Sequence, residues 1–282
     1  MKLYISVDME GATGIVRSEQ IRAESPEYGF GRRMQTGDLL AALEGAFDGG
    51  ATEVLINDSH DRMINISPSD LDHQPGSVSL ISGSPKPLGM MEGIQGCDAA
   101  VFLCYHAKAG TTKAVLDHTI SGRAIYQVFL NGIEMGETGL NAATAAQFGI
   151  PVIAVTGDHA LCREAQALLG DDLVVCQVKE GMGHSTARCL PPDASHTLIR
   201  DGISKATQQL CKGKKTPPPM DIGSGTFRLD LVFHYASQAD NAAIVPGTIR
   251  LDGRTVRVEG EGMDTMRQWA GALISLGGSV AF

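Results

Sequence analysis

Short apolar runs alternate with amphipathic helical patterns over the first 160 residues, and this alternation constrains the fold more than any other feature. Near-continuous apolar runs are typical of strands that are covered on both faces. When helical segments return the chain between such runs, successive strands pair in parallel. The sequence therefore predicts an α/β fold with three layers, αβα, around a mostly parallel sheet.

The expected elements of this half are strands at residues 3–7, 54–56, 99–104 and 151–155, and helices at residues 32–47 and 140–148. Asn131-Gly132 separates two further short runs and favours a tight antiparallel hairpin, because both positions tolerate positive φ. Asp158 is placed to cap a following helix.

The pattern changes after residue 190. We expect a helix at residues 195–210, strands near 227–234 and 255–259, and a last amphipathic helix with Met263, Met266, Ala270, Leu273 and Ile274 on its apolar face. This change predicts two domains, an α/β domain over residues 1–190 and a smaller α+β domain over residues 191–282.

The charge balance limits the partners of this chain. With 23 Lys and Arg against 32 Asp and Glu, the net charge is −9, which repels nucleic-acid backbones and anionic lipid. No apolar run approaches the roughly 20 residues needed to cross a bilayer. We therefore expect no nucleic-acid and no membrane partner.

Cysteine usage and the first residues indicate the compartment. The six cysteines form no Cys-x-x-Cys pair, and the acid at Asp8 interrupts the apolar start before a signal-peptide core can form. These features predict a cytoplasmic protein with reduced thiols.

Three of the expected strands end in residues that can bind a metal ion. Asp8 and Glu10 follow the first strand, and their spacing points both carboxylates to the same side of an extended segment. Asp58 and His60 end the second strand, and His106 ends the third. Ligands of open α/β sheets bind at the carboxyl edge of the strands, and mixed nitrogen and oxygen ligands suit zinc.

Each of these candidate residues also has a purely structural explanation. Asp8 and Glu10 could cap or solvate a loop, and Asp58 fits an N-cap or a partner of an imidazole better than a direct ligand. His118 could be a surface-loop histidine, and Glu137 a favourable acid in the first turn of a helix. The convergence of three strand ends in a chain with only eight histidines favours the metal site.

Five motifs keep a recognisable order and spacing: Val7-Asp8-Met9-Glu10-Gly11, Asn57-Asp58-Ser59-His60, Tyr105-His106-Ala107, Asp117-His118-Thr119 and Gly136-Glu137-Thr138-Gly139. Together they resemble the zinc D-aminopeptidases of the dipeptide-operon type (DppA-like). The resemblance covers nearly the whole chain and is most specific in the first 160 residues.

The resemblance implies two zinc ions per chain. Asp8 would bridge them, with Glu10 and His60 completing one site and His106 and Glu137 the other. Two Zn²⁺ bring four positive charges against three carboxylates, and a bound hydroxide would neutralise the remainder. Without metal, three converging carboxylates would repel, so at least one of their pKa values should rise.

The resemblance also makes His118 the catalytic histidine, which is often described as a nucleophile in this family. General base and proton donor are alternative roles. Two positions depart from the family pattern. Thr138 replaces a more hydrophobic residue, and Asp117 replaces a serine and could alter the proton affinity of His118.

The resulting hypothesis is a dinuclear zinc aminopeptidase that removes N-terminal D-amino acids, of the D-Ala type, from short peptides. The preference for D residues and the expected homo-oligomer, a decameric ring that admits only small peptides, come from the resemblance alone. Two alternatives remain open: another dinuclear metallo-hydrolase, such as an amidase or phosphoesterase, and a non-catalytic metal-binding protein.

Overall fold

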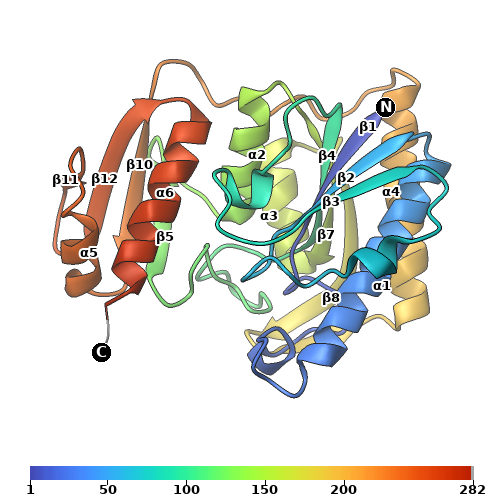
Figure 1. Cartoon of the computed structure of the whole chain (residues 1–282), viewed down its shortest axis with the longest axis horizontal. Coiled ribbons are helices and arrows are strands. Elements are labelled where there is room, and N and C mark those ends of the chain that lie inside the picture. The colour runs from blue at the N-terminus through green and yellow to red at the C-terminus, as the bar shows by residue number, and fades with distance from the viewer. Residues whose placement is uncertain (281–282) are drawn as a thin grey trace.

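Two sheets lie side by side in the computed structural model, which describes residues 1–280 (Figure 1). The described strands of the larger sheet are β1 (Lys2–Val7), β2 (Glu53–Asp58), β3 (Ser77–Ile81), β4 (Ala99–Tyr105), β7 (Val152–Asp158), β8 (Val174–Gly183) and β9 (Thr186–Cys189). Their order is β3-β2-β1-β4-β7-β8-β9, and neighbours are parallel except β8 with β9. The expected α/β fold with a mostly parallel sheet is confirmed.

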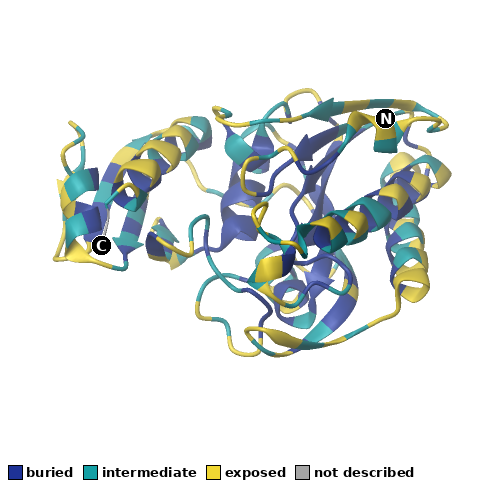
Figure 2. Cartoon of the chain, turned by 60° about the horizontal axis from the view of Figure 1, so that its bottom comes forward, coloured by how far each residue is buried: buried dark blue, intermediate teal, exposed yellow. Residues whose placement is uncertain are grey.

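Helices cover both faces of this sheet. On one face α1 (Tyr28–Asp48) and α4 (Pro192–Cys211) pack together, and α2 (Glu137–Gln147) and α3 (His159–Leu169) cover the other. Side chains alternate along β1, so Leu3 and Ile5 join the core beneath α1 and α4 while Tyr4 joins the opposite core. Figure 2 shows the central strands in the dark blue of buried residues, which explains their near-continuous apolar sequence.

Three strands of the larger sheet lie outside those predicted from the sequence. β3 is only partly buried and carries Ser77 and Ser79, so its apolar pattern is weak. β8 and β9 form an antiparallel pair at the opposite edge. The predicted cap of α3 is confirmed, because the Asp158 side chain accepts a hydrogen bond from Leu161 N at 2.8 Å.

The smaller sheet is antiparallel and carries its own helices. Its described strands are β5 (Ile125–Leu130), β6 (Ile133–Glu134), β10 (Thr226–Phe233), β11 (Ile249–Arg250) and β12 (Thr255–Glu261), in the order β11-β12-β10-β5-β6. Helices α5 (Ala236–Ala242) and α6 (Met263–Gly278) pack on it. Within residues 1–280, no helix has both the length and the apolar character that a bilayer crossing requires.

The predicted hairpin is confirmed, with Asn131 and Gly132 at φ of 52° and 83° between β5 and β6. The five predicted apolar residues of α6 are all buried beneath it. Helix α6 also contacts α2, so it stands between the two sheets in Figure 1.

The smaller sheet draws strands from both sides of residue 190. β5 and β6 precede this position and pair with β10, which follows it. The division into residues 1–190 and 191–282 stays a prediction. A boundary at residue 190 would separate β5 and β6 from the other strands of the smaller sheet.

Candidate metal centre

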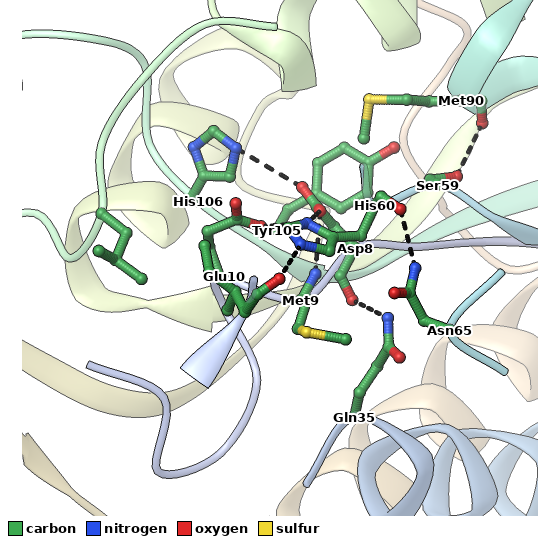
Figure 3. A network of polar contacts seen from close by, with 12 residues as sticks. Asp8, Met9, Glu10, Gln35, Ser59, His60, Asn65, Met90, Tyr105 and His106 are labelled. Carbon is green, nitrogen blue, oxygen red and sulfur yellow. Dashed lines mark hydrogen bonds and ion pairs between the residues drawn. The ribbon is translucent and has the colours of Figure 1, made fainter. Parts of the chain in front are cut away.

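The carboxyl ends of three adjacent parallel strands form the floor of the site. Val7 at the end of β1 pairs with Asp58 of β2 on one side and with Leu103 of β4 on the other. The residues that follow these three strand ends include two carboxylates and two imidazoles that are buried, namely Asp8, Glu10, His60 and His106. Figure 3 shows these four side chains directed toward one another.

Two further side chains reach the same point from other elements. Glu137 opens α2, and its Oε1 lies 3.2 Å from His106 Nε2 and accepts a hydrogen bond from Ile120 N at 2.7 Å. His118 belongs to the connection between β4 and β5, and its ring stacks on that of His106 with the centroids 4.0 Å apart. Its Nε2 is 3.5 Å from Glu137 Oε1 and 3.9 Å from Glu10 Oε1. The structure thus brings together all six side chains singled out in the sequence.

The six side chains form overlapping groups that could hold metal ions. Ligand atoms lie within 4.8 Å of one another in each of three groups: Asp8, Glu10 and His60; Asp8, His106 and Glu137; and Glu10, His106 and His118. Asp8 belongs to the first two groups and turns one oxygen to each. Its Oδ1 lies 3.2 Å from His60 Nδ1, and its Oδ2 lies 3.5 Å from His106 Nε2.

The hydrogen bonds of the imidazoles leave one nitrogen of each ring free to bind a cation. His106 Nδ1 lies 3.0 Å from Ala107 O and His60 Nε2 lies 2.9 Å from Ile21 O, and a carbonyl oxygen can only accept. In the neutral form of each ring, the other nitrogen therefore turns a lone pair toward the carboxylates. His106 Nε2 is buried and makes no hydrogen bond with any described residue. A cation between these lone pairs and the carboxylates would satisfy both, so the residues present fit a metal.

The pKa shifts of the site residues in the absence of metal also fit a site for a cation. Burial, together with the charge of Glu10, raises the pKa of Asp8 to about 8. Burial also disfavours ionisation of Glu137, but the adjacent His106 outweighs it and lowers the pKa of Glu137 to about 2. In turn, burial opposes a charge on His106, yet Glu137 holds the pKa of this imidazole well above its usual value. The predicted rise of at least one carboxylate pKa is confirmed.

A buried lysine holds the loop that carries Glu10. Lys179 of β8 is fully enclosed, and its Nζ donates to the carbonyl oxygens of Glu10, Ala12 and Ile15 at 2.6, 2.8 and 2.7 Å. Sequence reasoning missed this residue. The available signal was a lone Lys in an apolar strand, since charged side chains are rarely buried without partners.

The same loop packs closely against the end of β4. A Cβ on Gly11 would lie 1.9 Å from Tyr105 O, so only glycine permits this approach. The amide of Gly11 donates to Cys104 O at 2.7 Å, which ties the loop after β1 to the strand that delivers His106. Cys104 itself has φ of 61°, an uncommon value for a residue with a Cβ.

Two acidic residues near the site have structural partners. Asp58 accepts hydrogen bonds from Asn65 N, Asn65 Nδ2 and Ile66 N, which fixes the loop after β2. Asp117 accepts from Gly110 N at 2.7 Å and lies 2.7 Å from His184 Nδ1. His118 Nδ1 instead faces Leu116 O at 2.9 Å.

A cavity of about 1640 Å³ opens above the cluster. Five of the six site residues line it, Asp8, Glu10, His60, His118 and Glu137. Helix α6 also lines it, so the smaller sheet contributes a wall through its helix. Ligand sites of small molecules are commonly 300–1,000 Å³, so a cavity of this size has room for a short peptide.

Known proteins resemble this chain along most of its length. Residues 1–272 match the model of the Peptidase M55 family, described as D-aminopeptidase. A D-aminopeptidase of Bacillus subtilis (strain 168) is 34% identical over 266 residues, which are 93% of each chain. A solved structure described as the Zn-dependent D-aminopeptidase DppA from Bacillus subtilis, a self-compartmentalizing protease, is 31% identical and superposes with a TM-score of 0.92 over 100% of both chains.

Proposed function

Because the chain belongs to the Peptidase M55 family of D-aminopeptidases, we propose that it is a dinuclear zinc enzyme that releases N-terminal D-amino acids, of the D-Ala type, from short peptides. Family membership makes it a peptidase. The observation that carries the dinuclear assignment is that the two oxygens of Asp8 face two different histidines, each accompanied by a further carboxylate.

Two sets of ligands follow from this geometry. Asp8, Glu10 and His60 would hold one zinc ion, and Asp8, His106 and Glu137 the other. Bound zinc supplies a Lewis acid that polarises the scissile carbonyl and lowers the pKa of water. Zinc also suits the donors, which are imidazole nitrogens and carboxylate oxygens. The zinc dependence of the similar Bacillus subtilis protein supports this choice.

His118 is placed to handle the proton at the reacting centre. Its Nδ1 faces Leu116 O, so in the neutral ring Nε2 keeps its lone pair and points into the ligand cluster. Burial and the adjacent His106 lower the pKa of His118, which favours this neutral ring. We assign it the catalytic role, in which Nε2 accepts a proton from the attacking water and returns one to the leaving amine. In the alternative, Nε2 attacks the scissile carbonyl and the amine leaves with a proton, after which water hydrolyses the acyl-imidazole.

We also propose a homo-oligomer in the cytoplasm, of the decameric ring type expected from the family. The description of the similar solved structure as self-compartmentalizing supports an assembly. Exposed large apolar side chains are available for contacts between copies, among them Ile64, Ile133, Met182 and Ile244. Static light scattering of the purified chain tests this proposal, and a monomer at micromolar concentration would contradict it.

Metal analysis combined with an enantiomer panel tests the central proposal. The purified chain is assayed on D-Ala and L-Ala peptides before and after chelation. We expect about two zinc ions per chain and release of N-terminal D residues that stops when zinc is removed and returns when it is restored. Turnover that persists in fully metal-free protein would contradict the proposal, as would equal rates on the L peptides.

Ligand variants with a matched control locate the metals. Glu10→Ala and His106→Ala should each lower the zinc content and abolish turnover. Glu44→Ala, on the exposed face of α1, removes a carboxylate far from the cluster and should leave both unchanged. Hydrolysis of simple amides or phosphoesters, with no release of D residues from peptides, would favour a different dinuclear hydrolase.

A further inference from the structure

Helix α6 places one arginine in the wall of the cavity. Arg267 lines the same cavity as the metal-binding side chains, although it belongs to the helix that packs on the smaller sheet. A Cβ on Gly89 would lie 3.1 Å from Arg267 Nη2, so the guanidinium reaches the short helix Gly89–Met91 that borders the site. Burial lowers the pKa of Arg267, and Glu137 is the charge that opposes this shift most strongly. Arg267 therefore lies near the ligand cluster.

The guanidinium of Arg267 has no hydrogen-bond partner among residues 1–280. Its Nε and Nη1 are enclosed and make no hydrogen bond with a described residue, and Nη2 is not enclosed in this way. An unpaired buried charge is destabilising, so such a group is retained where an external anion pairs with it. Nη2 is the nitrogen that a carboxylate in the cavity can reach, and a charge-assisted hydrogen bond to it would offset the charge of the guanidinium.

Other cations that line the cavity are already engaged or lie at its rim. Lys86 Nζ donates to Asn57 Oδ1 and to Asp58 O, both at 2.6 Å, and so belongs to the floor of the site. Arg62 pairs with Glu24 at 2.6 Å on the surface. Arg22 and Arg123 also line the cavity, but both are exposed, so among the described residues Arg267 is the half-buried cation left for a ligand.

We propose that Arg267 binds the C-terminal carboxylate of the substrate, so that the enzyme selects free dipeptides and tripeptides. This inference rests on the proposed function, because a peptide held by its N-terminal residue at the metals carries its only obligatory anion at the other end. An extended chain spans about 3.3–3.6 Å per residue, so a carboxylate bound within the same cavity limits the substrate to a few residues. Longer peptides and peptide amides lack a carboxylate at this distance.

A matched pair of substrates isolates the carboxylate. The zinc-loaded full chain is assayed on D-Ala-D-Ala and on its C-terminal amide, with wild type, Arg267→Met and Arg267→Lys. We expect the wild type to favour the free acid by about 10- to 100-fold in kcat/KM, the range of a charge-assisted hydrogen bond. Arg267→Met should abolish this preference by raising KM for the acid. Its kcat/KM for the amide should stay within about twofold of the wild-type value. Arg267→Lys should retain part of the preference.

Arg123→Met is the matched control, because Arg123 is exposed at the rim of the same cavity. It should keep the preference for the acid. Equal kcat/KM of the wild type for the acid and the amide would overturn the inference. An Arg267→Met variant in which kcat/KM falls equally for both substrates would overturn it as well.

Thermal unfolding separates ligand binding from a structural role. Since Arg267 has no partner in the part of the chain that the structure describes, Arg267→Met without peptide should melt at the wild-type temperature or above it. A clear fall would indicate a structural role and would contradict the inference. If no D-peptide is hydrolysed, the proposed function fails, and calorimetry with the same two compounds still decides this inference. The inference is supported if the wild type binds the acid but not the amide and Arg267→Met does not bind the acid. It is overturned if the wild type shows no such selective binding.

Discussion

Asp8 connects the two halves of the site, since its Oδ1 lies beside His60 and its Oδ2 beside His106. A carboxylate in this position would be costly without cations, because it is buried and Glu10 carries a like charge beside it. The protonation of Asp8 and the binding of metal are therefore alternative ways to neutralise the same charge. This coupling makes pH a direct probe of the site.

His118 gives the first prediction at the residue scale. His118→Ala should lose hydrolysis of D-peptides by at least about 10²-fold, the usual contribution of a proton-transfer group. It should keep both zinc ions, because the two ligand sets that contain Asp8 do not include His118. Metal analysis and kinetics on one preparation check both halves of the prediction. Wild-type kcat in a folded variant would show that the catalytic histidine is misassigned.

The pH dependence of the stability of the metal-free protein gives the second prediction at the residue scale. Between about pH 4 and pH 8 the folded chain holds a proton on Asp8 that the unfolded chain has lost, so stability falls as pH rises. His60 and His106 act in the same direction above about pH 6.5, because neighbouring carboxylates outweigh burial and raise the pKa of each imidazole. The melting temperature of chelated protein should therefore fall from pH 5.5 to pH 8.5.

Zinc displaces these protons, so the rise in melting temperature on adding zinc should increase with pH over the same range. Asp8→Asn removes the ionisable group and should flatten the slope of the chelated protein below pH 6.5. A chelated wild type that becomes more stable from pH 5.5 to pH 8.5 would show that the carboxylates are not neutralised by protons in the absence of metal.

At the scale of elements, the site depends on how the loop after β1 is held. Lys179 of β8 donates to three carbonyl oxygens in that loop, and Gly11 permits its contact with Tyr105 O at the end of β4. Two strands, β4 and β7, separate β8 from β1 in the sheet, so this lysine reaches past both to the loop. The position of Glu10 therefore depends on a strand distant in sequence.

Lys179→Met gives the prediction at this scale. It fills similar space but leaves the carbonyl oxygens of Glu10, Ala12 and Ile15 without their donor, which should lower the free energy of unfolding by about 3 kcal/mol. Zinc affinity should fall as well, since the loop carries a ligand. Urea denaturation and zinc titration measure the two effects. Lys205→Met, exposed on α4, is the control and should change neither; an equal effect of both variants would refute the special role of Lys179.

At the scale of the whole molecule, the chain passes between the two sheets three times. The chain leaves the larger sheet to form β5 and β6, returns for α2 and β7, and crosses again to form β10 to β12. Helix α6 then packs between the sheets and lines the cavity. The site is thus formed by side chains of the first 137 residues and closed by a helix from the last twenty.

This arrangement predicts the behaviour of a fragment that ends at residue 190. It would lack β10, so β5 would keep only the short β6 as a ladder partner, and the apolar side chains of Ile125, Val128 and Leu130 would lose their cover. We expect the fragment to aggregate or to unfold without a cooperative transition, as judged by gel filtration and thermal denaturation beside the full chain. A monomeric fragment with a sharp transition would instead support the predicted domain division at residue 190.

The sequence carried enough local information to predict strands β1, β2, β4 and β7 of the larger sheet and four of the six site residues. Buried parallel strands are apolar throughout, and the carboxyl edge of such a sheet is where ligands bind, so Asp8, Glu10, His60 and His106 could be expected together. His118 and Glu137 have no such periodic signal, and only the resemblance to a family pointed to them. β3 was missed because its serines interrupt the apolar pattern.

What the sequence alone determined is the central strands of the larger sheet and the metal-binding residue types that follow three of them, because both depend on short stretches of adjacent residues. The tertiary structure decided which distant groups share the site. The ammonium of Lys179, the stacking of His118 on His106 and the guanidinium of Arg267 all come from segments far apart in the chain. Their distances depend on strand order and helix packing, which residue spacing does not encode.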